Sequence, residues 1–247
     1  MLKRFLLLVA ATVVLSSCCS NSVVRTVDPF VLDRMLYSSV ALVQEDDEGE
    51  NRAYCSGVWL SDSTLLTAYH CTEGIGLSPE EEAIVGITDE MPSPLWHRIK
   101  FVNWSSFHTQ SDMPEADEGV VIAADKIADL ALVQTKSTTW HTSVSISRSD
   151  IWIGQVAHSV GSSIGLPFSY APSIIGAIRL TTGPRDNLGL YLQTVSGATR
   201  GNSGGALFDD DGNVLGICSF IGRDTSLVFW IHRDSIRKFL KSSKVRL

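Results

Sequence analysis

Short apolar segments recur from about residue 38 to residue 231, and Gly-rich or polar turns separate them. Most segments have four to eight residues and are rich in Val, Ile, Leu and Phe, while helical periodicity is nearly absent among them. Regular strand-length segments with turns between them are typical of an all-β barrel or sandwich. The segments are Val40–Val43, Gly57–Leu60, Ile84–Ile87, Ile99–Val102, Gly119–Ala123, Leu130–Val133, Gln155–Val160, Ile174–Leu180, Leu190–Val195, Ala206–Phe208, Val214–Phe220 and Leu227–Ile231.

A polar stretch at residues 136–150 divides these segments into two sets of about six, which predicts two barrels. Helical periodicity appears at Arg233–Lys241, where Ile236, Phe239 and Leu240 share one face. We therefore expect an all-β fold of two six-stranded antiparallel β-barrels, followed by a short C-terminal helix at 233–241.

The N-terminus has the pattern of an export signal. Lys3 and Arg4 precede an unbroken apolar run, Phe5–Leu15. A membrane-spanning helix needs about 20 apolar residues, so this run is too short to span a bilayer.

The end of that run resembles the lipobox of bacterial lipoproteins, with the sequence Leu15-Ser16-Ser17-Cys18. This resemblance implies that Cys18 carries the lipid and becomes the mature N-terminus, so the protein would be exported and anchored to a membrane of the cell envelope. The alternative is an ordinary signal cleaved near Ser17 or Ser20, which would give a secreted or soluble periplasmic protein.

These patterns divide the chain into a signal, a linker and one large domain. The predicted divisions are a signal peptide at 1–17, a linker at 18–36 and a domain at 37–247, with the first barrel at about 37–135 and the second at about 150–232.

Composition excludes several other classes of protein. The chain has 247 residues, of which 44% are hydrophobic and 19% are charged, which is a globular composition rather than a disordered one. Its net charge of −7 argues against nucleic acid as a partner, since phosphate contacts require clustered Lys and Arg. Five cysteines are too few for a fold built on disulfides.

The cysteines fall into different environments. Cys55 and Cys71 flank a predicted strand hairpin and are natural disulfide partners in an exported protein. Cys218 lies in an apolar run, which favours a buried free thiol, and Cys19 has no assigned role.

Three segments carry residues suited to nucleophilic catalysis. They are CSGVWLSDSTLLTAYHC at Cys55–Cys71, ADLALV at Ala128–Val133 and GNSGG at Gly201–Gly205. The last one also matches the G-x-S-x-G elbow of α/β hydrolases, but that fold needs an acid and a histidine after the serine and helices between parallel strands. Only His232 follows Ser203, and strands surround the motif, so the sequence argues against that fold.

Together the three segments resemble those of trypsin-like (chymotrypsin-fold) serine proteases, over roughly residues 38–241. TAYHC is similar to that family's TA-A-H-C, ADLALV to its D-(I/L)-A-L strand and GNSGG to its G-D-S-G-G. The resemblance implies that Ser203 is the nucleophile, His70 the general base and Asp129 the residue that orients His70. Nearby Asp125 remains an alternative for the last role.

The resemblance also implies where the substrate lies. The backbone N–H groups of Gly201 and Ser203 would form the oxyanion hole. Ser219, Phe220 and Ile221 would pair with the substrate backbone as an added strand.

The pocket for the substrate residue before the scissile bond would include Gly197 and Ala198. Neither these residues nor Val228 places a charge at its base, which favours small or medium apolar side chains. Arg200 and Arg223 are expected at the rim, as ordinary exposed loop cations.

Position 202 departs from the pattern of proteases that are activated by N-terminal cleavage. Those members carry Asp there, which pairs with the new N-terminal ammonium, whereas this chain has Asn202 and no Ile-Val-Gly-Gly start. We therefore expect no activation by such cleavage.

The segments GNSGGALFDDDGNVLGI and LVFWIHRD are most similar to the HtrA/DegP-like branch of bacterial envelope proteases. The sequence ends at Leu247 without the PDZ domain common in that branch. We therefore expect a monomer with a protein or peptide substrate and without peptide-activated regulation or a cage-like assembly.

Two other functions fit the same three segments. One is a non-catalytic binding protein on the same fold, although such proteins usually lack a triad residue. The other is an esterase that uses the same triad.

The sequence gives no pattern for a metal or a cofactor, and we expect neither. The acidic run Glu45–Glu50 lacks the spacing of a calcium loop, and Asp209–Asn213 is expected to be a hairpin turn. The remaining histidines lack a metal-binding spacing and are expected to be structural or solvated. They are His97, His108, His141, His158 and His232.

Overall fold

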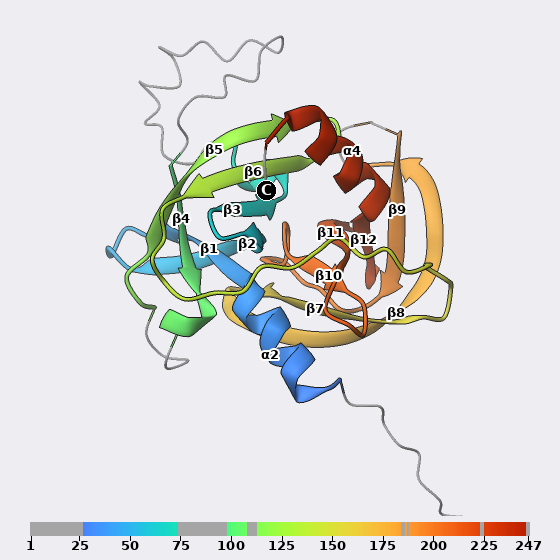
Figure 1. Ribbon diagram of the computed structural model, residues 1–247, viewed down its shortest axis with the longest axis horizontal. Coiled ribbons are helices and arrows are strands. Elements are labelled where there is room, and N and C mark those ends of the chain that lie inside the picture. Colours follow the sequence, from blue (N-terminus) through green and yellow to red (C-terminus); the bar gives the residue numbers. More distant parts are fainter. Residues whose placement is uncertain are drawn as a thin grey trace, which may run out of the picture.

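Residues 27–73, 98–107, 113–183, 186, 188–222 and 225–245 are described by a computed structural model (Figure 1). Its elements in chain order are α2 (Pro29–Ser38), β1 (Ser39–Glu45), β2 (Asn51–Ser61), β3 (Thr64–Thr67), η1 (Tyr69–Cys71), β4 (Arg98–Asn103), η2 (Trp104–Ser106), β5 (Asp117–Asp125), β6 (Leu130–Thr135), β7 (Val156–Ser163), β8 (Leu166–Thr182), β9 (Leu188–Val195), β10 (Ala206–Phe208), β11 (Val214–Ile221), β12 (Leu227–His232) and α4 (Arg233–Ser243).

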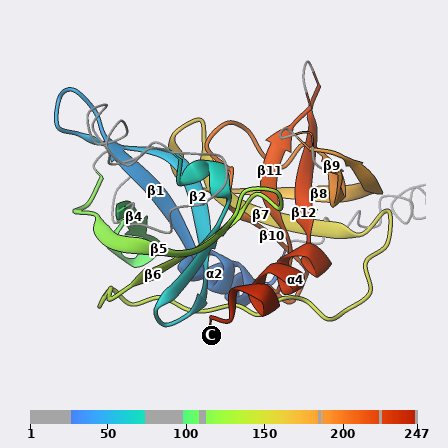
Figure 2. The same ribbon diagram turned by 90° about the horizontal axis from the view of Figure 1, so that it is seen from above.

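Strands β1 to β6 form a closed barrel in the order β1-β2-β3-β6-β5-β4, with β4 paired back to β1. All six pairings are antiparallel. This barrel occupies the left half of the molecule in both Figure 1 and Figure 2. Closure pairs both edges of the sheet, so no strand is left at an open edge.

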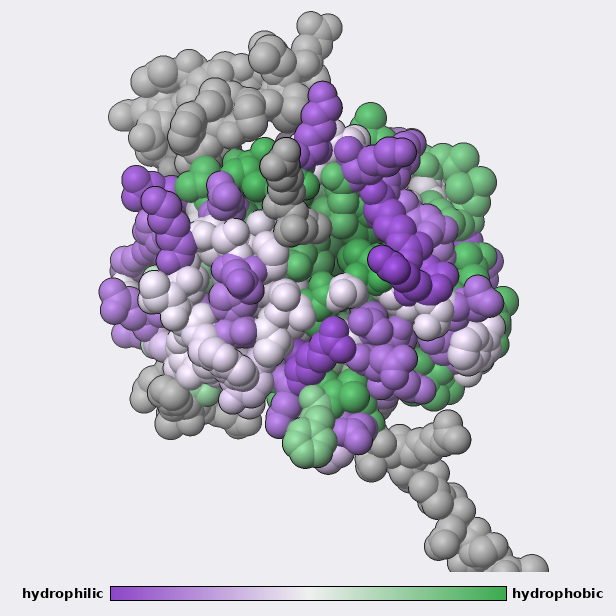
Figure 3. Space-filling view, in the orientation of Figure 1, coloured by the Kyte–Doolittle hydropathy of each residue, from purple (hydrophilic) through white to green (hydrophobic). Residues whose placement is uncertain are grey.

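Strands β7 to β12 form the second closed barrel, in the order β10-β11-β12-β9-β8-β7. The 17-residue strand β8 pairs with β7 along its first half and with β9 along its second half. Its long outer surface leaves hydrophobic side chains such as Ile174 and Leu180 exposed, and Figure 3 shows hydrophobic surface along this side. The predicted all-β fold of two six-stranded antiparallel barrels with a C-terminal helix is confirmed.

Strand β1 is buried on both faces, which explains why it is an unbroken apolar run. Val40 and Leu42 belong to a core made only of first-barrel residues. Ala41 and Val43 face the other way, into a core that includes Phe208 and other second-barrel residues. Because successive side chains of a strand point to opposite faces, β1 contributes to the first barrel and to the junction between the barrels at once.

Each barrel core contains a fully buried tryptophan whose ring N–H is paired. Trp59 donates to Asn103 Oδ1 at 2.8 Å in the first barrel, and Trp230 donates to Thr194 Oγ1 at 2.9 Å in the second. These hydrogen bonds remove the cost of burying the polar indole nitrogen.

Helix α2 occupies part of the stretch that we expected to be a linker, residues 18–36. Asp28 caps its N-terminus by accepting a hydrogen bond from the Phe30 N–H at 2.8 Å, and Pro29 suits the first turn. Met35 is completely buried, and Arg34 donates to the carbonyl of Asp211 in the β10–β11 turn at 3.1 Å.

Helix α4 follows β12 directly and packs across the second barrel. The Nδ1 atom of His232 accepts a hydrogen bond from the Asp234 N–H at 3.1 Å and so caps the helix. Ile236 and Phe239 are buried, as the sequence pattern predicts.

No helix within the described ranges is both long enough and apolar enough to cross a bilayer. The signal at 1–17, Cys18, Cys19 and the segment Ile84–Ile87 lie outside those ranges.

The closed first barrel makes a specific prediction about stability. Leu42 is completely buried, so Leu42→Ala is expected to lower the free energy of unfolding by about 2–5 kcal/mol in urea denaturation. Leu180 is 67% exposed. The matched change Leu180→Ala is expected to alter the free energy of unfolding by no more than about 0.5 kcal/mol. Equal losses in the two variants would contradict the burial described here.

Candidate active site

A disulfide holds the loop that carries His70. Cys55 in β2 and Cys71 in η1 are joined, with their Cα atoms 6.0 Å apart and a separation of 16 positions in the sequence. The hairpin of β2 and β3 brings the two cysteines together, and the hydroxyl of Tyr54 donates to the Cys71 carbonyl at 3.0 Å. The backbone on either side of His70 is therefore tied to strand β2.

The same sulfur atoms lie within 4.8 Å of a ring nitrogen of His70. Such a Cys–His cluster can resemble a metal site, but metal-binding cysteines act as thiolates. Here the two sulfurs are bonded to each other, so they are not available as thiolate ligands.

The imidazole of His70 is paired with the carboxylate of Asp129. The Nδ1 atom of His70 lies 3.0 Å from both Oδ1 and Oδ2 of Asp129, and the His70 backbone N–H donates to Oδ1 at 3.1 Å. Two donors from one residue fix both the position of the backbone and the tautomer in which Nδ1 carries the proton. The Nε2 atom is then the basic nitrogen, and the side chain is 32% exposed.

Asp129 is itself buried and held from a second direction. Only 4% of the residue is exposed, and Ser219 Oγ donates to its Oδ2 at 2.6 Å. Asp129 adopts a φ of 56° in the turn between β5 and β6, a left-handed conformation that Asp tolerates better than most residues. The turn and the serine together aim the carboxylate at His70.

The structure gives different contacts to Asp129 and Asp125, the two candidates for the residue that orients His70. Asp125 ends β5, and its Oδ1 accepts a hydrogen bond from the Ala128 N–H at 2.8 Å within the turn. Asp125 thus closes the local turn, whereas Asp129 contacts His70.

Ser203 lies beside the His70 loop. Its carbonyl accepts a hydrogen bond from the Ser56 N–H at 2.8 Å and lies 3.5 Å from the Sγ atom of Cys71. The serine is partly exposed, and no hydrogen bond joins its Oγ to His70 among the placed side chains. Catalytic hydrogen bonds are often long in a site without substrate, so this geometry is compatible with a nucleophile and its base.

The turn around Ser203 presents two backbone N–H groups that are free to bind an anion. Within the described chain, neither Gly201 N–H nor Ser203 N–H donates a hydrogen bond, whereas the neighbouring carbonyls are paired. The carbonyl of Arg200 accepts from Ile164 N–H at 2.7 Å, and that of Gly201 accepts from Ser56 Oγ at 2.8 Å. This pattern anchors the carbonyls and leaves the N–H groups available.

Gly201 is required for this turn for two reasons. Its φ of 95° is strained for any residue with a side chain, and a Cβ there would lie 2.0 Å from the carbonyl oxygen of Ser162. A larger residue would therefore displace β7 or the turn itself.

Asn202 is buried behind the turn, with 2% of the residue exposed. Its Oδ1 accepts a hydrogen bond from Ser163 Oγ at 2.9 Å, and its Nδ2 has no partner among the described residues. A side-chain hydroxyl from the same barrel thus satisfies the Asn202 oxygen.

The predicted pocket residues are mostly buried and include one strained backbone position. Gly197 has a φ of 94°, and a Cβ there would lie 2.9 Å from the Cβ of Ser173. Ala198 is partly buried, and Val228 is completely buried. The carbonyl of Ser196 accepts from Ser173 Oγ at 3.1 Å and from Thr194 Oγ1 at 2.8 Å, so among the described residues hydroxyl groups bind this backbone.

The predicted substrate strand at Ser219–Ile221 forms the end of β11. Phe220 and Ile221 are partly buried, and the ring of Phe220 stacks on Phe229 with centroids 4.5 Å apart. The side chain of Ser219 is buried, and its hydroxyl points to Asp129, which is a contact beyond the expected backbone pairing with a substrate. The sequence analysis missed this contact, since 90 residues separate the two partners.

Three of the remaining histidines have structural partners. His141 stacks on Trp59, His232 caps α4, and buried His158 lies 2.9 Å from both Tyr170 Oη and Asp210 Oδ1. His97, His108 and Arg223 lie outside the described residues.

Cys218 is a buried free thiol, next to the site but unsuited to react. Burial raises the pKa of this thiol to about 12, and the nearby Asp129 carboxylate contributes in the same direction. A protonated, inaccessible thiol is a poor nucleophile.

Comparison with known proteins identifies the family of this chain. The trypsin-like peptidase domain matches residues 55–217, which is about two thirds of the sequence. The chain therefore belongs to the trypsin-like peptidase family.

Two relatives by sequence are bacterial serine endoproteases. The chain is 37% identical over 101 residues to the probable periplasmic serine endoprotease DegP-like of Halomonas elongata, covering 41% of this chain and 21% of that protein. It is 33% identical over 98 residues to the periplasmic pH-dependent serine endoprotease DegQ of Escherichia coli, covering 39% and 22%. The match thus spans about a fifth of the length of each relative.

A solved structure with the same fold is the HtrA-type protease AlgW with a tripeptide. It superposes with a TM-score of 0.64 at 22% identity, over 86% of this chain and 62% of that one. This likeness supports the two-barrel fold.

The pairing of His70 with Asp129 predicts different effects for the two aspartates. Asp129→Asn would favour the wrong tautomer of His70 and is expected to slow labelling of Ser203 by a fluorophosphonate probe by about three to four orders of magnitude. Asp125→Asn retains an oxygen for the Ala128 N–H, so we expect its labelling rate to stay within about twofold of the wild type. The assignment fails if the Asp129 variant labels at the wild-type rate.

Proposed function

We propose that the protein is a serine endopeptidase in which Ser203, His70 and Asp129 form the catalytic triad. The observation that carries this proposal is the His70–Asp129 pair beside a turn whose Gly201 and Ser203 N–H groups are unpaired. Family membership and the naming of its relatives as serine endoproteases support the same activity.

In the first half-reaction, Ser203 Oγ attacks the scissile carbonyl carbon while His70 Nε2 accepts its proton. Asp129 holds the Nδ1–H and stabilises the imidazolium that forms. The carbonyl oxygen becomes an oxyanion and accepts hydrogen bonds from the N–H groups of Gly201 and Ser203. When the intermediate collapses, the C–N bond breaks and His70 gives its proton to the leaving amine.

The second half-reaction releases the acyl group from Ser203. Water replaces the amine, and His70 removes a proton from it as it attacks the ester carbonyl. Collapse of this intermediate breaks the ester bond, and the proton on His70 returns to Ser203 Oγ. The products are a carboxylic acid and the free enzyme.

The substrate is a protein or peptide that lies in extended conformation along Ser219–Ile221. Its side chain before the scissile bond would enter beside Gly197 and Ala198. Among the described residues, hydroxyl groups bind the carbonyls of Ser196 and Gly197, which agrees with the expected preference for a small or medium apolar group. A related HtrA-type protease has been solved with a tripeptide, which supports peptide binding in this family.

Two alternatives use the same fold, a non-catalytic binding protein and an esterase. The free N–H groups and the oriented histidine argue against a purely binding role, because a binding protein needs neither. An esterase shares every step up to the acyl-enzyme and differs only in its substrate.

The protein would act outside the cytosol. The export signal at 1–17, the Cys55–Cys71 disulfide and the periplasmic naming of the two relatives support export to the cell envelope. The lipobox adds a lipid anchor at Cys18 to this proposal.

Labelling and hydrolysis together test the catalytic proposal. Purified residues 20–247 are expected to react covalently with a fluorophosphonate probe and to cleave an unfolded protein at internal peptide bonds, as read by mass spectrometry. Ser203→Ala and His70→Ala should lose both activities, and circular dichroism would confirm that they fold. Labelling with cleavage of esters alone would favour the esterase, and no labelling of folded wild type would favour the binding protein.

The burial of Asn202 predicts that activity does not depend on a new N-terminus. Its oxygen already accepts a hydrogen bond from Ser163, so no ammonium group is needed to hold the turn. We expect kcat/KM for a peptide to agree within about twofold between a chain with an uncleaved N-terminal tag and the same chain after tag removal. Activity that appears only after trimming would contradict this expectation.

A further inference from the structure

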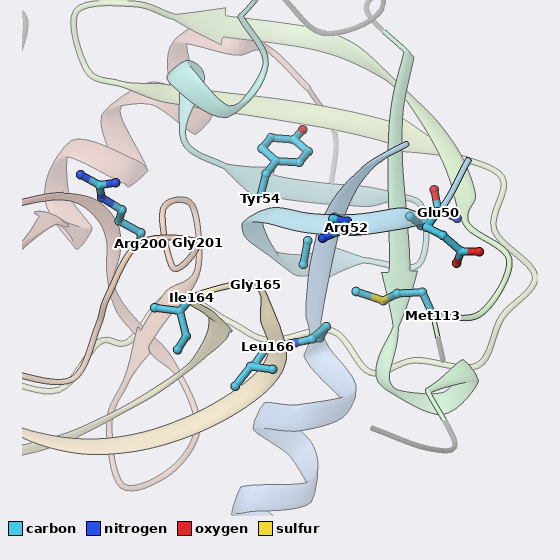
Figure 4. Close-up of a pocket in the computed structure, with 12 residues that line it drawn as sticks. Glu50, Arg52, Tyr54, Met113, Ile164, Gly165, Leu166, Arg200 and Gly201 are labelled. Atoms are coloured by element: carbon cyan, nitrogen blue, oxygen red, sulfur yellow. The ribbon is translucent and has the colours of Figure 1, made fainter. Parts of the chain in front are cut away.

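A groove leads away from the turn around Ser203 that carries the proposed oxyanion hole, which we call the oxyanion turn. It has a volume of about 740 Å³, within the range of ligand pockets, and Figure 4 shows Arg200 and Gly201 at one end and Glu50 and Met113 at the other. Gly201 therefore belongs both to the proposed oxyanion hole and to this groove. We name it the leaving-group groove, because we place in it the part of a bound peptide that follows the scissile bond, beyond Gly201.

One wall of the leaving-group groove is a segment of β2 that has a strand partner on only one side among the described residues. Along Ala53–Cys55, strand β2 pairs with β1 on one side, and its described pairing with β3 begins only at Val58. The Oδ1 atom of Asn51 is buried on the same wall and has no donor among the described residues. Both features suit the main chain of an extended peptide, which supplies N–H and C=O groups along its length.

The positive charges of the groove are not equivalent. Arg52 is ion-paired with Asp46 and lies 3.8 Å from Glu48, so neighbouring carboxylates balance its charge. Arg200 is exposed, and its guanidinium makes no ion pair or hydrogen bond with any described residue. The unbalanced cation therefore belongs to the residue at the Gly201 end of the groove. In Figure 4 its side chain extends away from Tyr54 and Met113, and an exposed Arg side chain with no described partner can turn toward a bound carboxylate.

The backbone of Arg200 is fixed where it meets the groove. Its carbonyl accepts a hydrogen bond from Ile164 N–H at 2.7 Å, which attaches it to the opposite wall of the groove. Beyond it, the side chains of Ile164 and Leu166 are 72% and 58% exposed, and both line the groove. The lining thus changes from cationic beside Gly201 to apolar, and then to anionic at Glu50.

We infer that the leaving-group groove selects substrates with an acidic side chain at the first or second position after the scissile bond, followed by apolar residues. This inference rests on the proposed endopeptidase function, and it assigns Arg200 as the residue that determines the preference. An aspartate or glutamate there would pair with the free guanidinium, and a later acidic residue would meet Glu50 instead.

The test uses pairs of quenched fluorescent peptides that differ only by Glu or Gln at the first or second position after the cleaved bond. At about 50 mM NaCl we expect the wild type to cleave the Glu peptide of at least one pair about three- to fivefold faster by kcat/KM, as for an exposed ion pair. The ratio should fall towards one at about 500 mM NaCl, because salt screens exposed charges. Mass spectrometry would confirm that both peptides of a pair are cut at the same bond.

Variants of Arg200 test whether this residue causes the faster cleavage of the Glu peptides. Arg200→Gln should reduce the Glu/Gln ratio to about one, and Arg200→Glu should bring it below one. The matched control is Arg148→Gln, which removes the same charge from an exposed position outside the groove and should keep the wild-type ratio. A wild-type ratio of one, or an unchanged ratio in Arg200→Gln, would overturn the inference even if the enzyme cleaves peptides.

Peptide binding to a Ser203→Ala variant tests the preference of the groove independently of catalysis. Fluorescence anisotropy with the same labelled peptides should give a similar ratio of Kd values, and Arg200→Gln in this background should abolish it. If the wild type cleaves nothing but this binding preference is present, the catalytic proposal fails and the groove inference stands. If peptides bind without any Glu preference, the groove inference fails.

Discussion

The carboxylate of Asp129 connects three segments that are far apart in the sequence. It accepts hydrogen bonds from the backbone and the ring of His70, and from the hydroxyl of Ser219. His70 and Asp129 belong to the first barrel, whereas Ser219 lies in β11 of the second. A buried carboxylate is costly unless its oxygens are paired, so the two barrels must dock in the register that supplies all these donors.

Ser56 makes a second polar connection across the same junction. Its N–H donates to the carbonyl of Ser203, and its Oγ donates to that of Gly201 and accepts from the Ser162 N–H. The oxyanion turn is therefore shaped by a first-barrel strand as well as by its own glycines. A small hydroxyl residue is suited to this place because it can donate and accept at once in a space with no exposed surface.

Much of this architecture could be predicted from the sequence because the signals were local. Strand-length apolar runs locate eleven of the described strands, and the fold class follows from their number and spacing. β3 was visible only as half of the hairpin between Cys55 and Cys71. Helix α2 was not predicted, since its stability comes from Met35 and Arg34 packing on a turn that forms almost 180 residues later.

The site shows the same division between local and distant information. Motifs indicated His70, Ser203 and the neighbouring Gly201, and the strand after Asp129 favoured it over Asp125. Contacts between remote segments could not be read from any motif. Ser219 meets Asp129 across 90 positions, and the attachment of Arg200 to Ile164 depends on how β7 and β8 turn in space.

The division of the site between the barrels has a consequence for the protein while it is being made. His70 and Asp129 are present once the first 135 residues have emerged, but the turn around Ser203 and Ser219 belong to the last part of the chain. During synthesis, the incomplete chain therefore holds the His70–Asp129 pair before the turn that carries Ser203 exists. Whatever chemistry Ser203 performs must wait until the second barrel closes.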